Sequence, residues 1–371
     1  MNRLLLLNPG PVTLSERVRN SLLSTDLCHR ESEFFDLQDE IRQRLLDVYG
    51  LAPQTWAAVL LTGSGTAAVE AMIASLVPDD SRLLVLENGV YGERISRIAQ
   101  IHGIASEALR GEWIAPVDLD ALRARLRATP RITHVAAVHH ETTTGRLNPL
   151  QAITAICAEH QVTVLADAVS SFGAEGIDFT SPALGAVAAT ANKCLHGVPG
   201  ACFVIARRTA LDQAVSRALY LDLAGWCRAQ DQRGTPFTPS VHAYYALREA
   251  LREFGDEGGW PARHACYAAL AAQVSAGFKA LGVEPLLPAA QSSVVLRAYR
   301  LPAGLAYPQL HDDLKARGFI IYAGQGGLAR ELFRISTMGA VTAADIDRLI
   351  NGVQASMGEY AAAANPEPEA E

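Results

Sequence analysis

Strand-length apolar runs alternate with helical patterns through the middle of the chain, and this alternation strongly limits the possible folds. Between residues 57 and 207 several runs are too continuously apolar to have one face in water. We expect strands at Ala57–Leu61, Leu83–Glu87, His134–His140, Val162–Ala166, Val187–Asn192 and Cys202–Ala206. We expect helices between them at Gly65–Leu76, Glu93–His102, Leu119–Ala128 and Pro149–His160. This order predicts right-handed crossovers and an α/β fold with a mostly parallel, doubly covered sheet.

A second pattern begins after a long predicted helix over Val241–Phe254. A new helix near Pro261, short strands and two further helices indicate a smaller α+β domain. The expected divisions are an N-terminal segment over 1–15, a large domain over 16–258, a small C-terminal domain over 259–360 and a disordered tail over 361–371. The tail is expected to be disordered because it is charged and contains proline.

Composition excludes several functional classes. The 371 residues carry a formal net charge of -7, which argues against a nucleic-acid partner. No apolar run approaches the length of a membrane span, and the start lacks the pattern of a signal peptide, so we expect a cytoplasmic protein. The six cysteines have no metal-ligand spacing, which predicts reduced thiols and no metal site.

Lysine is rare in this chain, and one lysine follows a predicted buried strand. Only Lys193, Lys279 and Lys315 accompany 29 arginines. Lys279 and Lys315 lie near the ends of amphipathic helices, whereas Lys193 follows an apolar strand. A buried amine has a lowered pKa and becomes a nucleophile. Asp167 ends another apolar strand; it either caps the next turn or faces a ligand at this edge of the sheet.

Three further groups lie at predicted strand ends. Thr62–Thr66 is a glycine-rich turn into a helix, where hydroxyls and backbone N–H groups can hold a phosphate, although tight-turn geometry explains it equally well. Tyr91 could stack on a ring or belong to the core. His140–Gly145 offers hydroxyls. A lysine, an acid, an anion cradle and a stacking ring are what a pyridoxal-phosphate enzyme requires.

Three strings carry a resemblance to a known family. His140–Pro149, Asp167–Gly173 and Ala191–Gly200 are similar to the class V branch of the fold-type-I pyridoxal-phosphate aminotransferases, and the likeness covers nearly the whole chain. It implies a large domain with a mostly parallel, seven-stranded type of sheet and a smaller C-terminal α+β domain. The implied cofactor is pyridoxal 5'-phosphate.

Carried over position by position, the resemblance assigns roles around the cofactor. Lys193 would hold the cofactor and move protons. Asp167 would pair with the pyridine nitrogen. Val169 and Tyr91 would cover the two ring faces, and Thr143 would lie near the ring oxygen.

The remaining roles concern anions. Ser64, Gly65 and Thr66 would hold the cofactor phosphate, and Thr238 would reach the phosphate of a neighbouring subunit, which implies a homodimer with shared sites. Arg334 matches the arginine that binds the substrate's anionic group. Arg30 either lies at the active-site entrance or pairs with nearby Glu31 or Glu33.

Within the branch, the strings are most similar to aminotransferases that act on 2-aminoethylphosphonate and pyruvate. The expected reaction is ping-pong transfer of the amino group to pyruvate, giving phosphonoacetaldehyde and L-alanine. The nearest alternative is an alanine–glyoxylate or serine–pyruvate aminotransferase. A cysteine desulfurase would need a mobile loop cysteine, and only Cys266 lies in the C-terminal third. A non-catalytic binding protein would not need the Asp167/Lys193 pair.

Overall fold

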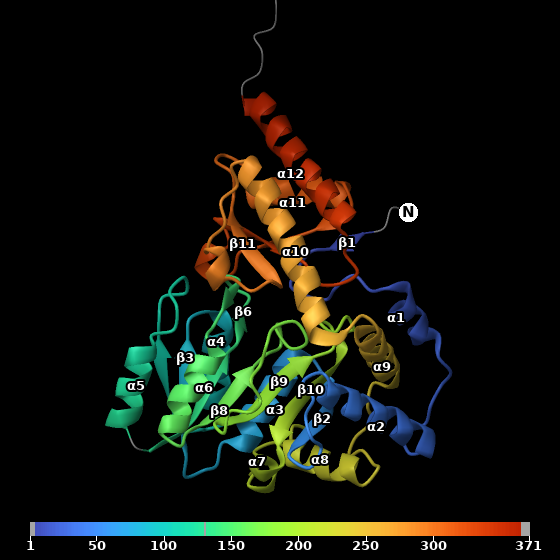
Figure 1. Ribbon diagram of the computed structural model, residues 1–371, viewed down its shortest axis with the longest axis vertical. Coiled ribbons are helices and arrows are strands. Elements are labelled where there is room, and N and C mark those ends of the chain that lie inside the picture. Colours follow the sequence, from blue (N-terminus) through green and yellow to red (C-terminus); the bar gives the residue numbers. More distant parts are fainter. Residues whose placement is uncertain (1–3, 130, 365–371) are drawn as a thin grey trace, which may run out of the picture.

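A computed structural model describes residues 4–129 and 131–364. Figure 1 shows a broad lower body built around a twisted sheet and a narrower upper body, with the long helix α10 (Gly259–Ala280) running from one to the other.

The lower body is centred on a seven-stranded sheet with the order β2-β10-β9-β8-β5-β3-β4. The strands are β2 (Trp56–Gly63), β3 (Arg82–Glu87), β4 (Ser106–Arg110), β5 (Ile132–Val138), β8 (Thr163–Asp167), β9 (Leu184–Thr190) and β10 (Gly200–Arg207). Strands β4, β3, β5, β8 and β9 pair in parallel, whereas β10 is antiparallel to both β9 and β2. The predicted α/β class and mostly parallel sheet are confirmed.

Strand β4 is the one strand of this sheet that the sequence did not indicate. It lies at the edge, and its residues Ser106–Arg110 are half-buried or exposed. An edge strand with few fully buried side chains lacks the continuous apolar run that marked the others.

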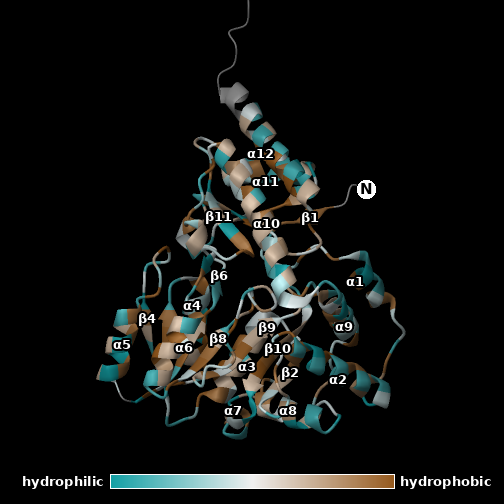
Figure 2. Ribbon diagram, in the orientation of Figure 1, coloured by the Kyte–Doolittle hydropathy of each residue, from teal (hydrophilic) through white to brown (hydrophobic). Residues whose placement is uncertain are grey.

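Helices cover both faces of the sheet, because alternate strand residues point to opposite sides. On one face, Leu60 belongs to a core with helices α2 (Ser32–Asp47), α5 (Leu119–Ala128), α6 (Leu150–Glu159) and α9 (Val241–Asp256). On the other, Val59 and Leu61 pack with α3 (Gly65–Leu76), α4 (Val90–Ile101) and α8 (Leu223–Asp231). Figure 2 shows the hydrophobic sheet between helices with hydrophilic outer faces. Among the described residues, no helix is both long and apolar enough to cross a membrane.

The upper body has its own small sheets and core. Strands β11 (Leu296–Arg300), β14 (Leu332–Ser336) and β13 (Tyr322–Ala323) form one sheet, and β1 (Leu5–Leu6) pairs in parallel with β12 (Phe319–Ile320). Helices α10, α11 (Tyr307–Ala316) and α12 (Ala343–Ala364) pack on them. Leu5 and Leu7 belong to this C-terminal core, so the N-terminal segment packs with the end of the chain.

The predicted domain boundaries remain predictions. The structure differs from them at one point, the start of the C-terminal tail. The expected start of the tail at residue 361 falls inside α12, which continues to Ala364. Residues 365–371 lie outside the described part of the chain.

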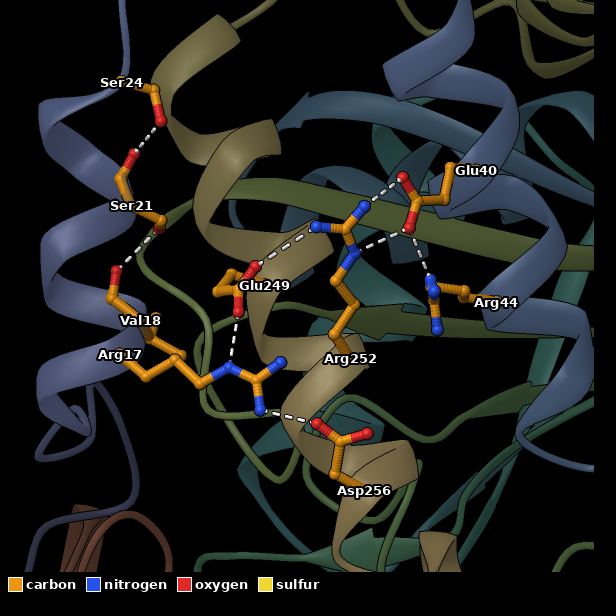
Figure 3. A network of polar contacts seen from close by, with 9 residues as sticks. All are labelled: Arg17, Val18, Ser21, Ser24, Glu40, Arg44, Glu249, Arg252 and Asp256. Atoms are coloured by element: carbon orange, nitrogen blue, oxygen red, sulfur yellow. Dashed lines mark hydrogen bonds and ion pairs between the residues drawn. The ribbon is translucent and has the colours of Figure 1, made fainter.

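A polar network joins the N-terminal helix α1 (Glu16–Asn20) to α9 and α2 (Figure 3). Arg17 pairs with Glu249 on α9, and Arg252 on the same helix pairs with Glu40 on α2 at 2.8 Å. These side chains are partly or fully exposed to water, so each ion pair contributes little to stability on its own. Together these ion pairs hold α1 against the lower body, at the point where the chain has passed there from β1 in the upper body.

Candidate active site

Lys193 and Asp167 come together at the carboxyl ends of neighbouring strands. Asp167 is the last residue of β8 and pairs with Ala188 of β9. Lys193 follows three residues after the end of β9, in the turn that leads into the antiparallel strand β10. The pairing of β8 with β9 therefore sets the distance between the two groups, as strand-end ligand sites in such sheets require.

The amine of Lys193 lies under the N-terminal segment. Its Nζ donates a hydrogen bond to the carbonyl of Pro9. A side chain on Gly10 would bring its Cβ within 2.8 Å of Lys193 Cδ, so only glycine fits there. Burial lowers the pKa of Lys193 to about 8, with Arg334 and Arg94 acting in the same direction and Asp167 opposing them. A substantial fraction of the amine is therefore neutral, and nucleophilic, near neutral pH.

Asp167 is buried but accepts a hydrogen bond. Its Oδ1 accepts from the Val169 N–H at 2.9 Å. Burial raises the pKa of Asp167 to about 6, while that hydrogen bond and the charge of Lys193 lower it. The carboxylate is thus mainly ionised at neutral pH, and it can hold a cationic N–H group.

The predicted anion cradle lies beside this pair. Ser64 is the N-cap of α3, and its hydroxyl makes no hydrogen bond within the described chain. A Cβ on Gly65 would lie 2.6 Å from Val169 Cγ1, so the helix start packs directly on Val169. The start of α3, with its N–H groups and the positive end of the helix dipole, therefore faces the loop after Asp167.

Arg94 joins the cradle to Tyr91, a role that was not predicted from the sequence. Its Nη1 donates to Thr66 Oγ1 at 3.1 Å, and its guanidinium lies 4.6 Å from the centre of the Tyr91 ring. In sequence, Arg94 looks like any charged residue on an amphipathic helix, so its inward position could not be recognised. It brings a positive charge to the edge where an anion is expected.

Glu141 organises two of the predicted residues. Its Oε1 accepts from the Thr143 hydroxyl at 2.6 Å, and its Oε2 accepts from the Tyr91 N–H at 3.2 Å. The side chain is fully buried, and burial raises its pKa to about 7. Glu141 lies inside the string His140–Pro149, but nothing in the string distinguished it from its neighbours.

The hydroxyls of the adjoining threonines differ in their availability. Thr143 is already engaged, because it donates to Glu141 and accepts from the Val90 N–H at 3.2 Å. The hydroxyl oxygens of Thr142 and Thr144 are buried without a hydrogen-bond partner in the described chain. A buried hydroxyl without a partner is costly, so these two positions indicate a ligand more directly than Thr143 does.

Arg334 reaches the same site from the upper body. It lies on β14 and is 4% exposed. Its Nη1 donates to the Thr142 carbonyl at 3.0 Å, and its Nε donates to the Ala323 carbonyl at 2.8 Å. Burial lowers the pKa of Arg334. A cation from the upper body thus faces the lysine of the lower body.

Thr238 and Arg30 do not join this group within one subunit. Thr238 is exposed, in the segment that leads into α9. Arg30 donates to the Thr235 carbonyl at 3.3 Å and pairs with neither Glu31 nor Glu33. Thr238 lies in the segment before α9, and Arg30 contacts the same segment at Thr235. This segment connects to the cradle through a hydrogen bond from the Ser240 N–H to the Thr62 hydroxyl at 2.9 Å.

Comparison with known proteins decides the family. A family model for aminotransferase class-V matches residues 17–349. The chain belongs to the aminotransferase class-V family. Among curated relatives, the 2-aminoethylphosphonate–pyruvate transaminase of Syntrophobacter fumaroxidans is 38% identical, over 97% of this chain and 98% of that protein. The transaminase of the same name from Vibrio vulnificus is 39% identical, over 96% and 98%.

Solved structures of other aminotransferases have the same architecture. An aspartate aminotransferase of subgroup IV from Thermus thermophilus is 28% identical and aligns with a TM-score of 0.87, over 96% of this chain and 99% of that one. Pyridoxamine–pyruvate aminotransferase from Mesorhizobium loti is 26% identical, with a TM-score of 0.89, over 97% and 93%. The predicted fold type is therefore confirmed.

The residues of this class-V aminotransferase fit pyridoxal 5'-phosphate, the cofactor of the family. Four groups meet at one edge of the sheet. They are an amine with a lowered pKa, an ionised carboxylate, a helix N-terminus with a free serine hydroxyl, and a buried threonine hydroxyl without a partner in the described chain. Each has the chemistry to meet a different group of the cofactor: the aldehyde, the ring nitrogen, the phosphate and the ring oxygen.

The lowered pKa of Lys193 leads to a test on the cofactor-free protein. Limited acylation with acetic anhydride, followed by mass spectrometry, should show Lys193 becoming reactive with a midpoint near pH 8. In Asp167→Asn the midpoint should be lower, because the carboxylate charge that favours the protonated amine is gone. Peptides with Lys279 and Lys315 provide internal references. A midpoint unchanged by Asp167→Asn would contradict the proximity of the pair.

Proposed function

We propose that this class-V aminotransferase transfers the amino group of 2-aminoethylphosphonate to pyruvate and forms phosphonoacetaldehyde and L-alanine. The printed names of the relatives that match nearly the whole chain support this substrate pair. The structural observation that carries it is the buried Arg334 facing Lys193, because one guanidinium serves both an anionic donor and an anionic acceptor.

The proposed roles follow the positions of the side chains. Lys193 holds the cofactor, and Asp167 pairs with its ring nitrogen. Val169 and Tyr91 would cover the two ring faces: the loop of Val169 packs on the start of α3, and the Tyr91 ring lies under Arg94, which contacts Thr66. Ser64, Gly65 and Thr66 bind the phosphate.

When bound, pyridoxal phosphate supplies a carbonyl for the amino group and a ring that withdraws electrons from the reacting carbon. Lys193, once its amine is free, accepts a proton from the substrate carbon and returns it at the next step, which suits an amine with a pKa of about 8. Asp167 keeps its ionised oxygens on the ring nitrogen and so favours the protonated ring. The N-terminal segment contacts Lys193 through the Pro9 carbonyl, which accepts a hydrogen bond from its amine.

Arg334 serves both halves of the reaction. Its planar fork matches a carboxylate and also binds phosphonate oxygens. Because β14 holds the backbone and the Ala323 carbonyl holds Nε, the guanidinium is oriented before a substrate arrives.

The first test is a half-reaction without keto acid. Loaded enzyme is mixed separately with 2-aminoethylphosphonate, alanine and serine, and the visible absorption of the bound cofactor is followed. We expect rapid change with 2-aminoethylphosphonate and alanine, slow change with serine and no turnover in Lys193→Ala. Change with alanine and serine alone would instead favour an alanine–glyoxylate or serine–pyruvate aminotransferase. A cysteine desulfurase is disfavoured because Cys266 lies on α10 rather than on a loop.

For the ring oxygen, we propose Thr142 in preference to Thr143, because the Thr143 hydroxyl is already bonded to Glu141 whereas the Thr142 hydroxyl lacks a partner in the described chain. Thr142→Val should weaken cofactor binding by about 10-fold, the loss of one hydrogen bond to a charged group. Equilibrium dialysis measures the affinity. Thr143→Val is the matched comparison and should act mainly by releasing Glu141. Normal cofactor affinity in Thr142→Val would return the role to Thr143.

We also propose a cytoplasmic homodimer with shared sites. Thr238 is exposed in its own subunit, and Arg30 contacts the same segment at Thr235. In the proposed dimer Thr238 reaches the partner's phosphate, and Arg30 lies at the partner's entrance, where it can attract an anionic substrate.

Mixed dimers test this arrangement. Thr238→Val should weaken cofactor binding, and Lys193→Ala removes the amine. If Thr238 acts across the interface, a mixed dimer has one intact site, because that site combines Lys193 of one subunit with Thr238 of the other. Co-expression at low cofactor concentration should therefore restore activity that neither variant has alone. No restoration, with mixed dimers demonstrated by two affinity tags, would place Thr238 in its own subunit's site or outside it.

A further inference from the structure

Arg334 does not have its whole fork available for a ligand. A guanidinium carries five N–H donors. Its Nε donates to the Ala323 carbonyl at 2.8 Å, and its Nη1 donates both to the Thr142 carbonyl at 3.0 Å and to Gln325 Oε1 at 3.2 Å. Within the described chain, Nη2 makes no hydrogen bond. While Gln325 stays in place, only one terminal nitrogen can bind an anion.

Gln325 is held at this position by its two neighbouring glycines. A Cβ on Gly324 would lie 2.2 Å from the Leu328 carbonyl oxygen, and one on Gly326 would lie 2.5 Å from the Trp113 ring. The Gly324 N–H also donates to the Leu332 carbonyl at 2.7 Å, which fixes the turn beside β14. The backbone therefore keeps the Gln325 side chain beside Arg334, while the side chain itself is only half-buried and can turn.

The orientation of the amide is determined by chemistry. A guanidinium only donates, so the amide oxygen faces Arg334 and the amide nitrogen keeps both N–H groups. An arriving anion competes with this oxygen for Nη1. When the anion takes its place, the amide turns, and its NH2 group becomes a donor toward the same anion.

Carboxylates and phosphonates differ in what they require. A carboxylate has two oxygens in a plane, and a guanidinium fork can bind both. A phosphonate has three oxygens in a tetrahedral arrangement, so a planar fork leaves at least one without a protein donor. An uncharged amide beside the fork can bind that oxygen without adding a charge.

We propose that Gln325 determines the preference of this site for a phosphonate over a carboxylate, by donating its amide N–H to the oxygen that Arg334 cannot reach. The inference rests on the proposed function, because it assumes that Arg334 binds the donor's anionic group. It adds a recognition element from the loop between β13 and β14.

Two variants separate a donor from a residue that only positions Arg334. Gln325→Glu keeps the acceptor for Arg334 but has no N–H donor and adds a negative charge. Gln325→Leu removes both acceptor and donor at similar size. In each loaded enzyme, ethylphosphonate and propionate, which have no amino group, are tested as competitors of the alanine half-reaction. Their inhibition constants report binding of three-oxygen and two-oxygen anions.

We expect the preference for ethylphosphonate over propionate to fall by about 10-fold in Gln325→Leu, as for one hydrogen bond to a charged group, and by more in Gln325→Glu. If Gln325 only positions Arg334, Gln325→Leu would weaken both competitors equally and Gln325→Glu would weaken neither selectively, which would overturn the proposal. The proposal would also be overturned if the preference for ethylphosphonate over propionate were unchanged in both variants. The same holds if the unmodified enzyme showed no such preference.

The same experiment keeps the two proposals apart. An unmodified enzyme that does not react with 2-aminoethylphosphonate would refute the proposed function. The competition between ethylphosphonate and propionate would still decide whether Gln325 recognises a phosphonate, because it depends only on the alanine half-reaction.

Discussion

An amine removed from water beside a carboxylate is the constraint on which the rest of the site depends. Lys193 can remain there because the turn between β9 and the antiparallel β10 places it beside Asp167, the end of β8. Burial disfavours both charges, and each charge partly compensates for the other. The parallel pairing of β8 with β9 is thus the feature of the sheet that brings the turn with Lys193 next to Asp167.

The surrounding charges are arranged in a similar way. Arg94 approaches from α4 and Arg334 from β14, and both favour the neutral form of Lys193. Glu141 accepts hydrogen bonds from the Tyr91 N–H and from the Thr143 hydroxyl, and so fixes both residues beside these charges. The site is therefore strongly polar inside a nonpolar fold, and most of its polar groups are tied to backbone or to one another. The buried hydroxyls left without a partner in the described chain, those of Thr142 and Thr144, indicate where a ligand binds.

Much of the fold could be predicted from sequence, because continuous apolar runs and helical periodicity record burial directly. The six expected strands and the position of Lys193 and Asp167 at strand ends follow from that pattern. The edge strand β4 could not be found, since an exposed strand has no such record. Arg94, Glu141 and Gln325 could not be assigned either, because a polar residue's orientation depends on contacts between distant segments. Gln325, for example, owes its position to Trp113 and β14, which no local pattern connects to it.

The pairing of β1 with β12 has a consequence for how the molecule is made. Residues near opposite ends of the chain form this parallel pair, and the Leu7 carbonyl accepts from the Ser336 N–H of β14. During synthesis, the segment that covers Lys193 therefore cannot pair with β12 and β14 until these late strands have been made. Contacts so distant in sequence form late and slowly. The sheet that carries Lys193 and Asp167 can be complete earlier, so the lysine is expected to be open to the surrounding solution during assembly and enclosed only at its end.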